Sequence, residues 1–231
     1  FIAQHGEAGI YANNDFFNIG WDKLICNKFL SWGKLKKQKH KKFFYTKKYF
    51  KNNNKFLFSS NNKILFVSHT FQETIVRYYN GVTAAEVNQT SFKNILSLSS
   101  SINQNIIYEP HLRSSDLTEN KTFKKEIKRI IPKLKFLDIK KNYLDIINNY
   151  NLIIHFFLST PFFESILHNT PTILIFEKKI HLNFNKNFNK MIKKLHKQKI
   201  FFSSTEKATK FINDNNGNLE KWWNSKSVQN L

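Results

Sequence analysis

Residues 152–176 constrain the fold more than any other part of this chain, because they read as a strand, a helix and a second strand. The first apolar run, residues 152–158, is rich in β-forming side chains and much shorter than a membrane span. We therefore expect a strand buried on both faces, as in a parallel sheet. A helix over residues 161–168 and a strand over residues 172–176 follow it.

The helix in this segment has start and stop signals. Thr160 suits the N-cap, and Pro161 suits the first helical position, where its missing N–H would have had no intrahelical acceptor. Asn169 and Pro171 stop the helix about two turns later. The N-terminus of this helix is therefore predicted to point out of the carboxyl edge of a parallel sheet, where α/β proteins bind phosphate groups.

Strand-length and helix-length segments alternate over most of the chain from Lys63 onward. Strands are predicted at residues 64–67, 105–108, 135–137 and 200–202, and helices at residues 122–131, 141–149, 184–197, 205–213 and 218–224. Residues 91–102 read as either a helix or a loop. Such alternation is typical of βαβ units, so the expected fold class is α/β, a Rossmann-like parallel sheet with helices on both faces.

The N-terminal part of the chain has a different pattern. Residues 1–35 read as a strand, a glycine-bearing loop, a short helix and a second strand at residues 28–31. Residues 34–55 are rich in lysine with interleaved Phe and Tyr, and read either as a solvated loop or linker or as a membrane-touching patch. Because Phe1 replaces an initiator Met and begins a strand entered midway, we expect an amino-terminally truncated fragment.

Composition excludes several classes of protein. The 231 residues are 41% hydrophobic, which is enough for a sizeable core in one large or two small domains and excludes a disordered chain. No apolar run approaches the roughly 20 residues of a membrane span, and no signal peptide is present in this sequence. The single cysteine, Cys26, excludes an internal disulfide framework and a multi-cysteine zinc site. These features predict a cytoplasmic protein.

The formal net charge of +21 has three interpretations. Lysine accompanies heavy use of Asn, Ile and Phe, as in the codon bias of an AT-rich genome, and this interpretation implies no partner. The second is peripheral contact with the anionic inner face of the plasma membrane. Nucleic acid comes last, and we expect no such partner, because arginine, the better ligand for phosphates and bases, occurs only at positions 77, 113 and 129.

The segment Gln4-His5-Gly6 is the first candidate for chemistry. A strand end runs here into a flexible turn that reaches Gly9, which would hold His5 in place while exposing its ring. An imidazole near neutral pH can take a proton from an attacking hydroxyl. The alternative interpretation is an ordinary surface histidine.

The second candidate is the segment of residues 108–115, at the end of an apolar strand. His111 and Arg113 alternate along an extended stretch and so point to one side, where they could contact a phosphate or pyrophosphate. The alternative is a charged loop in which these groups pair with Glu109 or Asp116.

The third candidate is the helix start at Ser159 and Thr160, with Glu164 one turn into the helix. Hydroxyls and amides suit phosphate oxygens, and a carboxylate accepts two hydrogen bonds at once and so matches the vicinal hydroxyls of a ribose. The alternative is a capped helix whose glutamate only complements the helix dipole.

Six short motifs occur in a characteristic order: Gln4-His5-Gly6, Phe29-Leu30-Ser31-Trp32-Gly33, Ser159-Thr160, Glu164-Ser165, Asn169-Thr170-Pro171-Thr172 and Trp222-Trp223. This order resembles bacterial surface-carbohydrate transferases of the GT-B type, relatives of the CDP-glycerol glycerophosphotransferases and capsule sugar transferases. The closest similarity is to a transferase family of surface-polysaccharide loci, and it covers essentially the whole chain.

In such folds two Rossmann-like domains face each other across a cleft, and the C-terminal one holds the nucleotide donor. The resemblance therefore implies that residues 1–50 end an acceptor-side domain, residues 51–62 form a linker and residues 63–231 form the donor-binding domain. It implies that His5 is the catalytic base. It also implies that His111 contacts phosphate or stabilises the leaving group.

The activity implied by the resemblance is transfer of a sugar or polyol-phosphate group from a nucleotide-activated donor to a polysaccharide or lipid-linked acceptor. The substrate-binding candidates are then Gly6, Arg113, Ser159, Thr160, Glu164 and Ser165. Asp-x-Asp metal-ligand motifs are absent from the sequence, so we expect a metal-independent reaction that uses no cofactor. The alternative is a non-catalytic protein with a degenerate transferase fold that binds a nucleotide or an anionic glycan.

Overall fold

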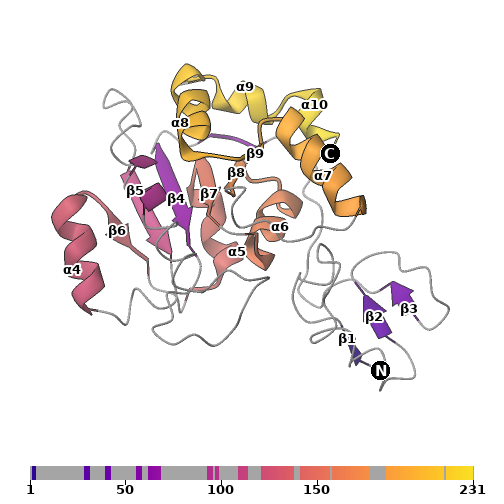
Figure 1. Ribbon diagram of the computed structural model, residues 1–231, viewed down its shortest axis with the longest axis horizontal. Helices are drawn as coiled ribbons and strands as arrows, with labels where there is room; N and C mark the ends of the chain where they lie inside the picture. Colours follow the sequence, from indigo (N-terminus) through magenta and orange to yellow (C-terminus); the bar gives the residue numbers. More distant parts are fainter. Residues whose placement is uncertain are drawn as a thin grey trace.

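The computed structural model describes residues 2–3, 29–31, 40–42, 56–58, 62–68, 93–95, 97–98, 109–113, 121–137, 141–156, 158–176, 186–215 and 217–230. These residues form two parallel sheets (Figure 1). The smaller sheet has the order β1-β2-β3, with strands β1 (Ile2–Ala3), β2 (Phe29–Ser31) and β3 (His40–Lys42). The strands predicted at the start of the chain and at residues 28–31 are therefore confirmed.

The larger sheet contains six parallel strands in the order β6-β5-β4-β7-β8-β9. Their bounds are β4 (Lys63–Val67), β5 (Glu109–Arg113), β6 (Lys135–Phe136), β7 (Leu152–His155), β8 (Thr172–Ile175) and β9 (Phe201–Phe202). Numbered from β4 along the chain, this order is 3-2-1-4-5-6, the order of a doubly wound Rossmann-like sheet. The order reverses between β4 and β7, and ligands bind outside the carboxyl ends of the strands at such a point.

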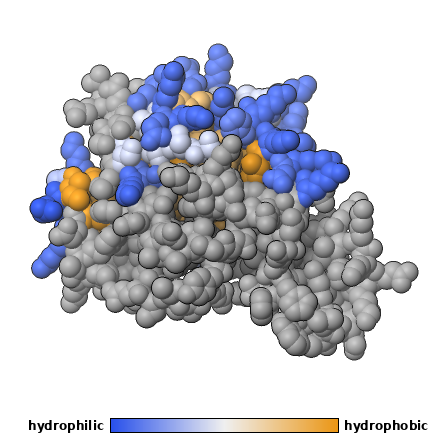
Figure 2. Space-filling view, viewed as in Figure 1, coloured by the Kyte–Doolittle hydropathy of each residue, from blue (hydrophilic) through white to orange (hydrophobic). Residues whose placement is uncertain are grey.

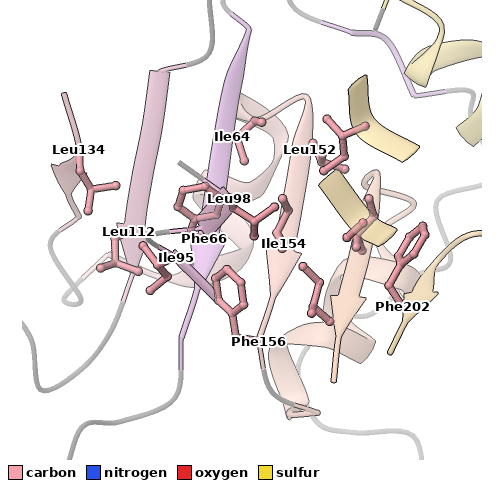
Figure 3. Packing of buried hydrophobic residues seen from close by; sticks show 14 of the residues in the cluster. Ile64, Phe66, Ile95, Leu98, Leu112, Leu134, Leu152, Ile154, Phe156 and Phe202 are labelled. Atoms are coloured by element: carbon pink, nitrogen blue, oxygen red, sulfur yellow. The ribbon is translucent and has the colours of Figure 1, made fainter. Parts of the chain in front are cut away.

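Successive residues of the central strands pack against different clusters of buried side chains. Ile64 and Phe66 of β4 lie in one cluster with Ile154 of β7 (Figure 3), whereas Leu65 and Val67 lie in another. Since side chains alternate between the faces of a strand, both faces of β4 and β7 are covered. This confirms the predicted fold class, a parallel sheet that is buried on both sides.

Helices supply the two covering layers. They are α4 (Lys121–Ile130), α5 (Tyr143–Ile146), the 3₁₀ helix η2 (Ile147–Asn149), α6 (Thr160–Leu167), α7 (Lys186–Lys197), α8 (Thr205–Asp214), α9 (Leu219–Trp223) and α10 (Lys226–Gln229). One face of the sheet packs against residues of α4 and α8 and against the helical residues 93–98, of which 96 is not described. The other face packs against α5, η2, α6 and α7.

Helix α6 begins one residue earlier than predicted. Ser159, not Thr160, is the N-cap, because its backbone is still extended with φ −144° and ψ 167°. Pro161 is therefore the second helical residue, which costs no hydrogen bond because the first N–H groups of a helix have no intrahelical acceptor. At the other end, Asn169 adopts the left-handed conformation with φ 57°, and the helix stops where the sequence predicts.

Strand β5 lies in a segment that the sequence did not predict as a strand. The sequence places a strand at residues 105–108, which lie outside the described residues, whereas the structure has β5 at Glu109–Arg113. The Leu112 carbonyl accepts from Leu137 on the β6 side, so the missing N–H of Pro110 also faces that side. Because β6 pairs with β5 only from His111 onward, the proline removes no ladder hydrogen bond there.

Three other segments refine the sequence prediction. Residues 34–55 are not a loop throughout, because β3 (His40–Lys42) lies within them as the last strand of the smaller sheet. Lysine is common in such edge strands, where it discourages further pairing. The described part of residues 91–102 is helical, and α10 is a helix that the sequence did not predict.

Candidate functional site

The register of the sheet brings Arg113 and His155 to the same level. Both residues pair with Val67, the last residue of the strand that lies between them. Each is also the last residue of its own strand, β5 or β7. The two side chains therefore flank the carboxyl end of β4, beside the reversal of strand order.

Arg113 lies over the aromatic ring of Tyr143 from α5. Its guanidinium carbon is 5.2 Å from the ring centroid, which is cation–π distance. The Nη1 atom is buried and has no hydrogen-bond partner among the described groups. Burial lowers the pKa of the guanidinium, and the nearby Tyr143 and Glu164 oppose this shift. Arg113 thus presents a cation with an unsatisfied donor at the carboxyl edge.

A buried hydrogen-bond network lies beneath this arginine. Ser165 Oγ donates to the Pro161 carbonyl over 2.9 Å and lies 2.5 Å from Tyr143 Oη. The Nε2 atom of His155 is 3.3 Å from Ser165 Oγ and 3.4 Å from Tyr143 Oη. His155 and Ser165 have no exposed surface, and Tyr143 is also buried. The network therefore joins β7, α5 and α6 at the carboxyl edge.

The protonation state of His155 follows from assigning each hydroxyl proton in the network to one acceptor. A carbonyl can only accept, so the Ser165 proton goes to Pro161, and Tyr143 must then donate its own proton to Ser165 Oγ. His155 Nε2 therefore carries a proton and donates toward the two oxygens, while Nδ1 is an unprotonated acceptor. Burial lowers the pKa of His155 to about 3, so the ring stays neutral at ordinary pH. Nδ1 is buried without a partner.

The N-terminal half of α6 supplies the third part of the site. Ser159 makes no side-chain capping hydrogen bond, and its side chain is half-buried. Glu164 is buried and acts electrostatically on both Arg113 and Tyr143. Thr160 lies four residues before Glu164 and so shares its side of the helix.

These observations bring Arg113, Glu164 and Ser165 together around Tyr143 and place Ser159 and Thr160 on the helix that carries Glu164. His111 lies two residues before Arg113, and its backbone pairs with Leu65 and Lys135; its side chain is not described. His5 and Gly6 lie outside the described residues. The substrate-binding and catalytic roles of all these residues stay predictions.

The comparisons with known proteins give the family of this chain. A family model described as LIC12162 family transferase matches residues 1–231, which is the whole chain. The chain belongs to this family of transferases. No curated protein matches it. Since the match spans both sheets, the Rossmann-like sheet and its carboxyl edge are parts of a transferase.

Two members of the buried network in this transferase were not singled out from sequence. His155 stands in an otherwise apolar run, and a polar ring in a fully buried strand needs a polar partner, which was the available signal. Tyr143 gives no comparable signal, because its partner Ser165 lies 22 residues away.

Two of the short motifs named in the sequence analysis meet in a structural contact. Trp223 Nε1 donates to the Asn169 carbonyl and to Asn169 Oδ1, over 3.1 and 3.0 Å. Trp222 Nε1 donates to the carbonyl of Gln198 over 2.9 Å. These bonds connect α9 to the turn after α6 and to the residue after α7, and so support α6, whose N-cap is Ser159.

Three further observations concern the rest of the described part of this transferase. No group of three or more His, Cys, Asp and Glu side chains that could hold a metal occurs among the described residues. None of the helices formed by these residues has the length and apolar character needed to cross a membrane. A polar hollow is lined by Ser97 and by residues of α8, on the sheet face opposite Tyr143.

Proposed function

We propose that this transferase moves a sugar or polyol-phosphate group from a nucleotide-activated donor to a polysaccharide or lipid-linked acceptor of the cell surface. One observation carries the proposal. Arg113 holds a buried, unpaired Nη1 donor at the carboxyl edge of a sheet with Rossmann-like strand order. An arginine in such a position suits a phosphate, since its guanidinium forms charge-assisted bonds with phosphate oxygens.

The donor would bind with its phosphates between Arg113 and the start of α6. The amino end of a helix carries a partial positive charge and unpaired N–H groups, both of which favour phosphate. The hydroxyls of Ser159 and Thr160 would add hydrogen bonds. Arg113 Nη1 has no hydrogen-bond partner among the described groups, so it makes no hydrogen bond to Glu164. The Glu164 carboxylate would accept hydrogen bonds from both ribose hydroxyls of the nucleotide.

The chemical step follows from the roles assigned by resemblance. The acceptor hydroxyl oxygen would form the new bond to the transferred group and lose its proton to His5. The bond from that group to the nucleotide phosphate would break, and the electron pair would leave with the phosphate oxygen. Arg113, His111 and the α6 dipole would stabilise this charge. Gly6 would allow close approach of the acceptor, and the step uses no metal or cofactor.

The proposed function assigns the chain to the same three parts that the resemblance to GT-B transferases implies. Residues 63–231 would hold the donor, residues 1–50 would belong to the acceptor side, and residues 51–62 would link them. The described linker residues contact the C-terminal part directly: Asn224 bonds to both the N–H and the carbonyl of Phe56, over 3.1 and 3.0 Å. The reaction would take place on the cytoplasmic side of the membrane.

A donor screen tests the proposal on the full chain. CDP-, UDP-, GDP- and CMP-linked sugars and polyols are compared by thermal unfolding, because a ligand at a hundred times its Kd stabilises the native state by about 2.7 kcal/mol. We expect one nucleotide class to raise the melting temperature and to release its nucleotide when an acceptor glycan is added. Binding without release would favour the non-catalytic alternative. Stabilisation by no nucleotide would contradict the donor site.

A further inference from the structure

Helix α7 has two faces of opposite character. Phe188 and Leu195 are buried in one hydrophobic cluster with Ile200 and Phe201, so this side of α7 faces the protein. At about 100° per residue, these two side chains lie close together around the helix axis. The opposite side of α7 therefore faces away from the core.

The outward side of α7 is a stripe of lysines. All of its members are exposed and fall within an arc of about 100° at 3.6 residues per turn: Lys186, Lys190, Lys193, Lys194 and Lys197. The stripe is roughly 16 Å long at about 1.5 Å per residue. Residues 178–199 contain no Asp or Glu at all. Figure 2 shows strongly hydrophilic side chains over this part of the surface, at the right of the view.

Lysine-rich composition alone does not explain the stripe. The neighbouring helix α8 belongs to the same chain, yet it alternates Glu206, Lys210 and Asp214 at four-residue spacing. Opposite charges four residues apart attract each other across one turn. On α7 the corresponding pairs are lysine with lysine, as in Lys190 and Lys194, and such pairs repel. An external anionic surface would relieve this repulsion.

We propose that the lysine stripe of α7 docks this protein on an anionic membrane surface. Lysine is a compact point charge on a flexible stem, which suits a diffuse array of lipid headgroups. The stripe has no arginine for bidentate contacts and no aromatic ring on which bases could stack, so nucleic acid fits it less well. The inference concerns a surface outside the proposed donor site and stands independently of it.

Vesicle sedimentation tests this docking surface. The full chain is mixed with vesicles of phosphatidylcholine alone or with about 30% phosphatidylglycerol, at low and moderate salt. One variant carries K190Q, K193Q, K194Q and K197Q, and a control that loses the same charge carries K133Q, K207Q, K221Q and K226Q. Glutamine has nearly the helix propensity of lysine, and all eight side chains are exposed.

The wild-type protein should sediment with the anionic vesicles only, and salt should weaken the binding. Each lysine near an anionic surface strengthens binding roughly fivefold, so the α7 variant, which loses four lysines, should bind roughly several hundredfold more weakly. The control variant should lose far less of its affinity for the anionic vesicles. Equal losses in both variants would contradict the proposal, because net charge rather than α7 would then explain binding. Absence of binding to the anionic vesicles would overturn the proposal, and tight binding to duplex DNA would then favour nucleic acid as the partner.

Discussion

His155 should make the stability of this transferase depend on pH between 7.5 and 5.5. In the folded protein its pKa is lowered to about 3 by burial, whereas in the unfolded chain it returns to the ordinary value of 6.5. As pH falls below 6.5, the unfolded chain therefore binds a proton that the folded protein does not. The contribution of the neutral, buried ring to the free energy of unfolding is therefore fully present above pH 6.5. It is lost progressively as the pH falls from 6.5 toward 3.

The size of this effect follows from the two pKa values. One unit below the unfolded pKa, proton binding to the unfolded chain lowers the free energy of unfolding by about 1.4 kcal/mol. Because His155 has no exposed surface, solvent does not screen this difference. The loss between pH 7.5 and pH 5.5 should therefore be about 1.4 kcal/mol from this single residue.

The assay is urea unfolding, followed by tryptophan fluorescence at the two pH values. His155→Leu removes the titrating group and leaves the bond between Tyr143 and Ser165 in place. His196→Gln changes an exposed histidine and serves as the control. The His155→Leu variant should lose about 1.4 kcal/mol less than wild type, and the control should lose as much as wild type. If His155→Leu loses as much as wild type, the neutral buried state is refuted.

Three further substitutions test the site. Ser165→Ala leaves the buried Tyr143 hydroxyl without its acceptor and His155 Nε2 with only one of its two acceptors, so urea unfolding should show a loss of about 1–3 kcal/mol; an unchanged free energy would show that the network contributes little. Glu164→Ala should weaken nucleotide binding in calorimetry while leaving the fold intact by circular dichroism; unchanged affinity would mean that the carboxylate only complements the helix dipole. His5→Ala should lower turnover about a hundred- to ten-thousand-fold with donor binding retained, and wild-type turnover would exclude a base at this position.

Most helices and strands can be predicted from the sequence, because the residues that start, form and stop each of them lie within it or beside it. Strand β7, helix α6 and strand β8 each have an apolar run or a cap within a few residues. Residues 109–113 were not predicted as a strand, because Pro110 and the charged residues around it are unusual in a strand. Only the pairing with β6, which begins at His111, explains why the proline is tolerated there.

The candidate site is less accessible to sequence reasoning, because it depends on which strands are neighbours. The sequence singled out Arg113 and Glu164 separately, and the strand order explains why they meet. Strand β4 lies between β5 and β7, so residues 42 positions apart, Arg113 and His155, flank the same residue, Val67. Tyr143 joins the site through a helix whose packing no local pattern reveals.

Calorimetric titration of Arg113→Gln with the nucleotide that stabilises the wild-type protein tests the central claim most directly. Arg129→Gln on α4 removes the same charge from an exposed position and is the matched control. A lost hydrogen bond to a charged group is worth about 1.5–3 kcal/mol, so Arg113→Gln should weaken nucleotide binding at least about tenfold, while Arg129→Gln should bind as wild type does. Equal nucleotide affinity in the two variants would contradict a donor phosphate site at Arg113.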